Sequence, residues 1–159
     1  MRSVTRVLTV LLIVLCAASG HMLAQMDPRG GTWHLNLAKS TFDPGPAPKS
    51  QTRVYEMAHD MLKATTTSVQ MDGSKSVSAY GARFDGKDYP ATGSPVYDTI
   101  ALTRVDANTF DAALKRSGKV VQTARNVVSA DGKSMTVTVN GADAGTGQKF
   151  TTVMVFDKQ

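Results

Sequence analysis

Polar and apolar residues alternate along most of the chain, and the alternation is clearest around the only tryptophan. The stretch 31–37 has the sequence Gly-Thr-Trp-His-Leu-Asn-Leu. Successive side chains of a β-strand point to opposite faces, so this period of two is typical of a strand with one buried face. The buried face would carry Trp33, Leu35 and Leu37, and the other face Thr32, His34 and Asn36. We therefore predict that 31–37 is the first strand and anchors the core.

Further short alternating segments follow, separated by residues that favour turns. Asp72-Gly73, Asp85-Gly86 and Asp131-Gly132 are pairs suited to tight hairpins. The nine strands predicted in this way are 31–37, 52–58, 62–70, 75–84, 99–105, 109–115, 120–129, 134–140 and 149–157. Consecutive hairpins favour an up-and-down order over a Greek-key sandwich, and closure removes exposed sheet edges. The predicted fold class is all-β, an antiparallel meander closing into a barrel of about 8–10 strands.

Three places depart from the regular pattern. The segment 38–51 contains three prolines, which fix φ and lack an N–H donor, so it is predicted to be an extended connector. The segment 85–97 is the longest later break and is either a loop at the barrel mouth or a surface connection. Val127 and Val128 fall on opposite faces of one predicted strand, and a β-bulge there would reconcile them.

The N-terminal segment has the three parts of a secretory signal: Arg2 and Arg6, an apolar run, and small residues before a polar break. The apolar run is shorter than the ~20 residues that a membrane span needs. We predict that residues 1–24 are a signal peptide, cleaved after Ala24, and that residues 25–159 form one exported domain in the periplasm or outside the cell.

Alternatives to this cleavage remain open. Ala18 and Gly20 are other small-residue candidates. Cys16 would be the acylated residue of a lipoprotein signal, but Leu15 stands where such signals have a small residue. Cleavage after residue 24 removes the only cysteine, so the mature chain would have no disulfide.

Charge and candidate chemistry exclude several function classes. Loss of two arginines with the signal lowers the formal net charge from +5 to +3, and the basic residues are scattered, which argues against nucleic acid as a partner. His34 and His59 are isolated, whereas a metal site needs three or four converging ligands. The chain has no GxSxG elbow. We therefore expect neither enzymatic activity nor a metal or other cofactor; the oligomeric state is left open.

A short motif resembles known β-barrel families. Gly31-Thr32-Trp33 matches the GxW of the first strand of lipocalins and is similar to the opening of intracellular fatty-acid-binding proteins. The meander and the terminal Val-Phe-Asp-Lys resemble the same calycin plan, so the resemblance implies a lipocalin-like barrel. Segments such as Phe-Asp-Gly-Lys-Asp-Tyr-Pro resemble small uncharacterised exported bacterial proteins, which implies no activity.

The chain also departs from the calycin pattern. Fatty-acid-binding proteins hold the ligand carboxylate with an Arg-x-Tyr on the last strand, where this chain has Met154-Val155-Phe156. Lipocalins place a basic residue of the last strand across the tryptophan, and only Lys149 or Lys158 could do so here. The helical lid of the fatty-acid-binding proteins has no counterpart, because the connector cannot be helical.

Several predicted inward faces mix apolar residues with arginine and tyrosine. Arg53 shares a face with Tyr55, and Arg104 alternates with apolar residues in the same way. An inward Arg53 would need a carboxylate partner or a ligand, and the alternative is an arginine that reaches solvent at the rim. The residues predicted to line a ligand site are Trp33, Arg53, Tyr55, Tyr80, Arg104 and Phe110.

Two function classes follow from these faces. The first is the binding of a small apolar or amphipathic molecule inside the barrel. The second is a non-enzymatic structural or interaction domain of the cell envelope, with an interior filled by side chains as in many small barrels. A contiguous internal cavity of ~300 Å³ or more would favour the first class.

Overall fold

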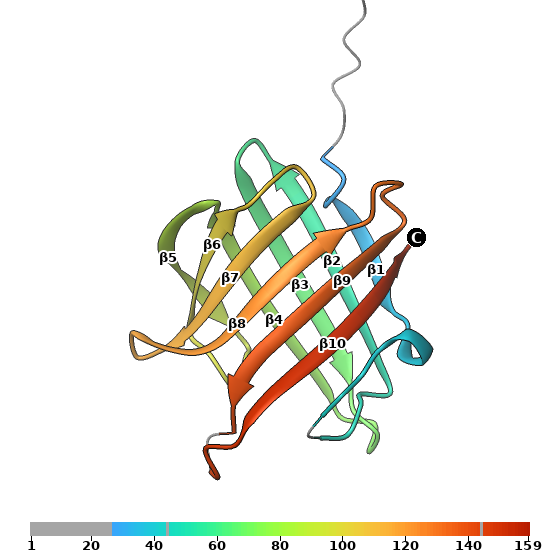
Figure 1. Cartoon of the computed structure of the whole chain (residues 1–159), viewed down its shortest axis with the longest axis vertical. Coiled ribbons are helices and arrows are strands. Elements are labelled where there is room, and N and C mark those ends of the chain that lie inside the picture. Colours follow the sequence, from blue (N-terminus) through green and yellow to red (C-terminus); the bar gives the residue numbers. More distant parts are fainter. Residues whose placement is uncertain (1–26, 44, 144) are drawn as a thin grey trace, which may run out of the picture.

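The described residues of the computed structural model, 27–43, 45–143 and 145–159, form a closed β-barrel of ten antiparallel strands (Figure 1). The strands are β1 (Gly31–Leu35), β2 (Ser50–Ala58), β3 (Met61–Val69), β4 (Lys75–Arg83), β5 (Asp85–Thr92), β6 (Thr99–Arg104), β7 (Thr109–Arg116), β8 (Lys119–Val128), β9 (Ser134–Ala142) and β10 (Lys149–Lys158). The predicted fold class is confirmed. The predicted signal peptide, residues 1–24, lies outside the described residues, and no helix in the described part is long and apolar enough to cross a membrane.

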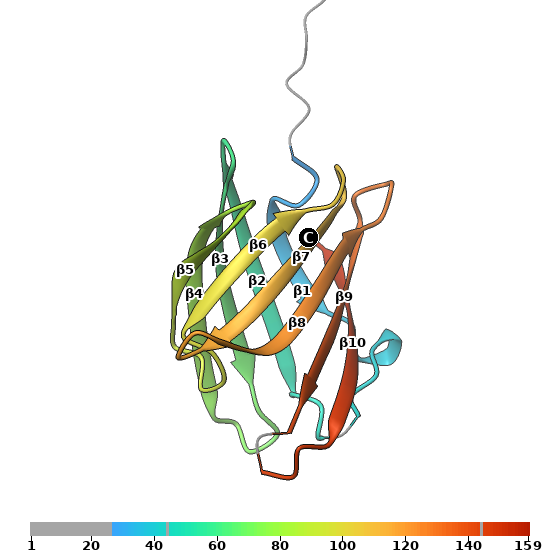
Figure 2. The same ribbon diagram turned by 60° about the vertical axis from the view of Figure 1, so that its left-hand side comes forward.

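Each strand pairs with the next one in sequence, and β10 closes the barrel by pairing with β1. This up-and-down order gives the barrel two distinct ends, seen at the top and bottom of Figure 2. One end, which we call the closed end, holds residues 27–30 before β1 and the C-terminus. The other, which we call the mouth, holds the connector before β2, the β3–β4 and β9–β10 turns, and the 93–98 loop between β5 and β6.

All nine predicted strands are present, with ends that differ by at most two residues. The tenth, β5, lies where the sequence indicated a loop over 85–97. Its first four residues are exposed, its register with β6 shifts between Asp85 and Asp88, and Pro90 interrupts its row of donors. It pairs with β4 through only two residue pairs. The sequence of β5 therefore lacks the hydrophobic alternation that is typical of a strand with a buried face. Since 85–92 nevertheless forms a strand, the prediction of a loop there was wrong.

The first strand ends earlier than predicted. β1 stops at Leu35, and a 3₁₀ turn, η1 (Leu37–Lys39), follows, capped by the Asn36 side chain, which accepts a hydrogen bond from the N–H of Lys39. Leu37 is 43% exposed, so its predicted place on the buried face was wrong. The turn leads the chain out of the core while keeping it beside β10.

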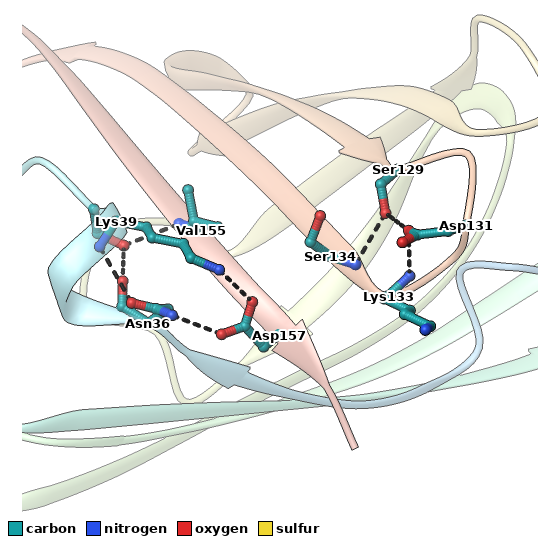
Figure 3. A network of polar contacts seen from close by, with 9 residues as sticks. Asn36, Lys39, Ser129, Asp131, Lys133, Ser134, Val155 and Asp157 are labelled. Atoms are coloured by element: carbon teal, nitrogen blue, oxygen red, sulfur yellow. Dashed lines mark hydrogen bonds and ion pairs between the residues drawn. The ribbon is translucent and has the colours of Figure 1, made fainter.

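Polar contacts hold this turn against the last strand (Figure 3). Asn36 Nδ2 donates to Asp157 Oδ2 at 2.6 Å, and Lys39 Nζ lies 3.2 Å from Asp157 Oδ1. Further along the connector, Thr41 and Val153 exchange two backbone hydrogen bonds, of 2.7 and 2.9 Å. The connector therefore starts by extending the β1 edge along β10.

The bulge lies elsewhere than predicted. Val127 is 38% exposed and Val128 only 2%, so the two residues simply face outward and inward on a regular strand. The register of β7 with β8 instead shifts at Leu114, which faces Gln122, while Lys115 faces Val120. Val121 is thus the extra residue of a bulge near the mouth.

The closed half of the barrel is filled with side chains. Trp33, Phe110 and Phe156 are fully buried, together with Leu62, Leu102 and Met135. The Trp33 indole donates to the carbonyl of Arg29 at 2.9 Å, and Lys158 Nζ lies 5.0 Å from the ring centroid of Trp33. At the same end, the fully buried Arg29 side chain forms an ion pair with Asp27. The anchor predicted at Trp33 is therefore confirmed.

Candidate ligand-binding cavity

The inward side chains of three neighbouring strands change from apolar to polar towards the mouth. Tyr55, Ala64 and Tyr80 lie in one row across β2, β3 and β4. Two residues nearer the mouth, the same strands carry Arg53, Thr66 and Ser78, and the next row is Gln51, Ser68 and Ser76. Because neighbouring strands are in register, these changes coincide and produce one polar wall.

The wall bounds an internal cavity of about 360 Å³ in the mouth half of the barrel. The polar wall consists of Gln51, Arg53, Thr66, Ser68, Gln70, Ser76, Ser78 and Tyr80. The opposite wall is mainly apolar and consists of Ile100, Ala112, Leu114, Ala124, Val137, Val139 and Met154, with Gln122, Asn126 and Thr152 between them. The barrel is therefore filled at one end and hollow at the other.

Arg53 brings a positive charge to the polar wall, and no carboxylate of the described residues forms an ion pair with it. Its guanidinium lies 4.6 Å from the ring centroid of Phe156, and its Nε donates to Gln51 Oε1 at 3.2 Å. Its Nη1 lies 3.4 Å from the Tyr55 hydroxyl, and its Nη2 4.0 Å from the Met154 sulfur. No ion pair joins Arg53 to any carboxylate within 27–43, 45–143 and 145–159. These neutral contacts orient the guanidinium and leave its charge available to an anion.

Two phenols beside Arg53 remain protonated. Burial, followed by the proximity of Tyr55 and Tyr97, raises the pKa of Tyr80 well above its usual value. Burial also raises the pKa of Tyr97, although Arg53 acts in the opposite direction. Both side chains are therefore neutral hydrogen-bond donors at physiological pH. Together with Arg53 they form a donor-rich corner of the cavity, which is suited to an oxygen-bearing acid group.

The structure brings together only some of the residues predicted to line a site. Arg53 and Tyr80 line the cavity, and Tyr55 contacts Arg53 from the buried layer beneath. Trp33 and Phe110 are fully buried in the closed half and are not among the residues that line the cavity.

Arg104 lies at the closed end, outside this cavity. It is exposed, and its guanidinium lies 4.8 Å from the ring centroid of Phe84. The Arg29 guanidinium lies over the same ring, at 4.6 Å, and Phe84 packs edge-on against Phe110. The structure therefore separates Arg104 from Arg53, although the two have the same pattern in the sequence.

Most residues of the polar wall were not among the predicted site residues. Ser78 lies two residues from Tyr80 on the same predicted strand. Thr66 and Ser68 continue the period of two that starts at Leu62, so this period could have located all three. Tyr97 and its neighbours in the 93–98 loop reach the cavity from outside any strand, and no periodic signal could have found them.

The two histidines among the described residues lie apart from the cavity. His34 is on the outer face of β1, where its Nδ1 lies 3.4 Å from the Thr52 hydroxyl, and His59 is exposed in the β2–β3 turn. Within the described part of the chain, no three His, Cys, Asp or Glu side chains converge in a way that could hold a metal ion. The chain matches no protein-family model and has no significant match among curated proteins.

Proposed function

We propose that the protein is an exported, lipocalin-like binding protein that takes up a small amphipathic molecule in the mouth half of its barrel, without catalysing a reaction. The acid head of the ligand would meet Arg53, with Tyr80 and Tyr97 as further donors. Its apolar body would lie against the wall formed by β6, β7 and β9.

The observation that carries this proposal is the two-sided cavity with an unbalanced Arg53. A volume of about 360 Å³ falls in the range of small-molecule sites. A barrel selected for stability alone would gain from aliphatic side chains at these inward positions, since burying hydroxyl and guanidinium groups has a desolvation cost. A ligand with matching polar and apolar sides would offset that cost.

The closed end supports the lipocalin-like assignment. The residue pairing between β1 and β10 places Lys158 opposite Trp33, and its ammonium group lies over the indole. Of the two lysines that could occupy this position, Lys158 is therefore the one that does, as the resemblance to lipocalins implies.

The proposal is tested by thermal-shift and calorimetric titration of the purified protein with three amphiphiles that each carry a ten-carbon chain, decanoate, decanol and decyltrimethylammonium. Aromatic acids and an isoprenoid acid complete the panel. A ligand present at 100 times its Kd stabilises the folded state by about 2.7 kcal/mol, which corresponds to roughly 5–10 °C in Tm. We expect decanoate to bind most tightly of the three.

Arg53→Gln and Arg104→Gln form a matched pair, since each removes one positive charge. We expect Arg53→Gln to abolish the preference for decanoate and Arg104→Gln to leave it unchanged. Absence of binding by every class would instead favour the alternative, a structural or interaction domain of the cell envelope.

A further inference from the structure

An apolar groove lies on the outside of the barrel at the mouth. It has a volume of about 550 Å³ and lies between the 93–98 loop, the β7–β8 turn and the end of β9. We call it the valine groove, after Val96, Val120 and Val121, which line it together with Pro95 and Ala142. Val96 is 40% and Val120 55% exposed, so the groove presents aliphatic surface to solvent.

The charged residues of the groove are hydrogen-bonded to nearby backbone groups. Arg116 donates from Nε to the carbonyl of Val96 at 2.8 Å and from Nη2 to the carbonyl of Pro95. Asp143 Oδ1 accepts hydrogen bonds from the backbone N–H groups of Gly145 and Thr146 at 3.0 and 2.7 Å. The groove therefore offers a partner mainly aliphatic surface, including the methylene stem of Arg116.

The β-bulge explains why two consecutive valines of β8 line the same groove. On a regular strand, Val120 and Val121 would point to opposite faces. The extra residue, Val121, breaks that alternation, because Lys115 pairs with Val120 while Leu114 pairs with Gln122. Bulges often re-aim side chains beside functional sites.

The groove adjoins the internal cavity. Pro95 and Gln122 line both spaces, so the groove lies next to the cavity at the mouth. The cavity alone has the volume of about a dozen water molecules of ~30 Å³ each. A methylene group needs a similar volume, so an acid with about ten carbons would fill the cavity.

From this adjacency, and resting on the proposed function, we infer that the ligand is a long-chain acidic amphiphile whose tail leaves the cavity between Pro95 and Gln122 and lies in the valine groove. The acid head at Arg53 and the tail in the groove would then occupy two subsites. The aliphatic surface of the groove would be covered by the ligand and removed from water.

The test measures Kd for saturated fatty acids of 8, 10, 12, 14 and 16 carbons, each below its critical micelle concentration. A buried methylene strengthens binding about fourfold. We expect affinity to keep rising beyond ten carbons, because the additional methylenes lie in the groove. If affinity levels off at about ten carbons while binding itself persists, the tail subsite is wrong and the cavity proposal stands.

Val120→Ser and Val105→Ser form a matched pair, since the two valines are 55% and 53% exposed and Val105 lies at the closed end. We expect Val120→Ser to weaken hexadecanoate binding roughly threefold to tenfold and to leave decanoate unchanged. Val105→Ser should change neither. Equal effects of the two variants, or no effect of Val120→Ser and of the double variant Val96→Ser/Val120→Ser, would overturn the tail subsite. Absence of binding at every chain length would overturn both proposals.

Discussion

Lys158 and Trp33 face each other across the seam that closes the barrel, with the Lys158 ammonium 5.0 Å from the indole centroid. The same ammonium group donates to the carbonyl of Pro28 at 3.0 Å. The contact therefore joins the first strand, the last strand and the segment before β1. A cation over an aromatic face is attracted by the ring quadrupole, so this contact stabilises the closed end.

Trp33→Ala should lower the free energy of unfolding by about 3–5 kcal/mol, because it removes a fully buried aromatic side chain from a filled core. Urea denaturation measures the change. Leu37→Ala is the control, since Leu37 belongs to the same predicted face but is 43% exposed, and its effect should be within about 0.5 kcal/mol. Similar losses for the two variants would contradict the position of Trp33.

The ion pair between Asp27 and the buried Arg29 at the closed end makes stability sensitive to acid. Burial alone would raise the pKa of Asp27, but hydrogen bonds from Arg29 and its charge outweigh that effect, so the pKa is lowered. A lowered carboxylate pKa contributes stability above the usual Asp value of about 3.9, and that stability is lost as the pH falls through the lower value of the folded state. Stability should therefore fall below about pH 4.

Asp27→Asn isolates this contribution, because it keeps the size of the side chain and removes its charge. The Arg29 guanidinium would remain buried without a counter-charge, so we expect a loss of roughly 2–4 kcal/mol at pH 7. The loss relative to the wild type should shrink on acidification. Asp157→Asn, at an exposed pair, should cost much less. An unchanged urea midpoint for Asp27→Asn at pH 7 would argue against the pair.

At the mouth, the backbone leaves no room for a side chain at Gly93. Its φ is +74°, and a Cβ atom there would lie 1.9 Å from the carbonyl oxygen of Val77. Gly118 also has a positive φ, of +77°, but has open space around it. Gly118→Ala should thus cost about 1–2 kcal/mol from backbone strain alone, and Gly93→Ala about 1–3 kcal/mol more from the clash. Equal denaturation midpoints would show that the 93–98 loop can move away from β4.

Export and processing can be examined directly by mass spectrometry of the protein recovered from a secreting host. We expect a mature chain that begins at Gln25 and contains no cysteine. A retained N-terminus, or a lipid mass on Cys16, would mean that the protein is held at a membrane surface.

Periodicity and turn chemistry determined most of the barrel by themselves. The alternation around Ile100, Phe110 and Met135 identified inward positions that are indeed buried, and Asp-Gly pairs marked the turns after β3 and β8. These features are local, because a strand with one buried face needs alternation whichever strand pairs with it. Nine of the ten strands could therefore be predicted without any knowledge of their partners.

The tertiary structure alone decided which inward residues share a space. Arg53 and Arg104 both alternate with apolar residues, yet Arg53 lines the cavity and Arg104 lies at the closed end. Strand direction and register set the level of a residue along the barrel, and both depend on how distant segments pair. The same holds for β5, which is held by its neighbours rather than by its own pattern, and for Tyr97, which reaches the cavity from a loop. A period of two specifies the face of a strand on which a side chain lies, whereas barrel closure specifies the height of that side chain and its neighbours.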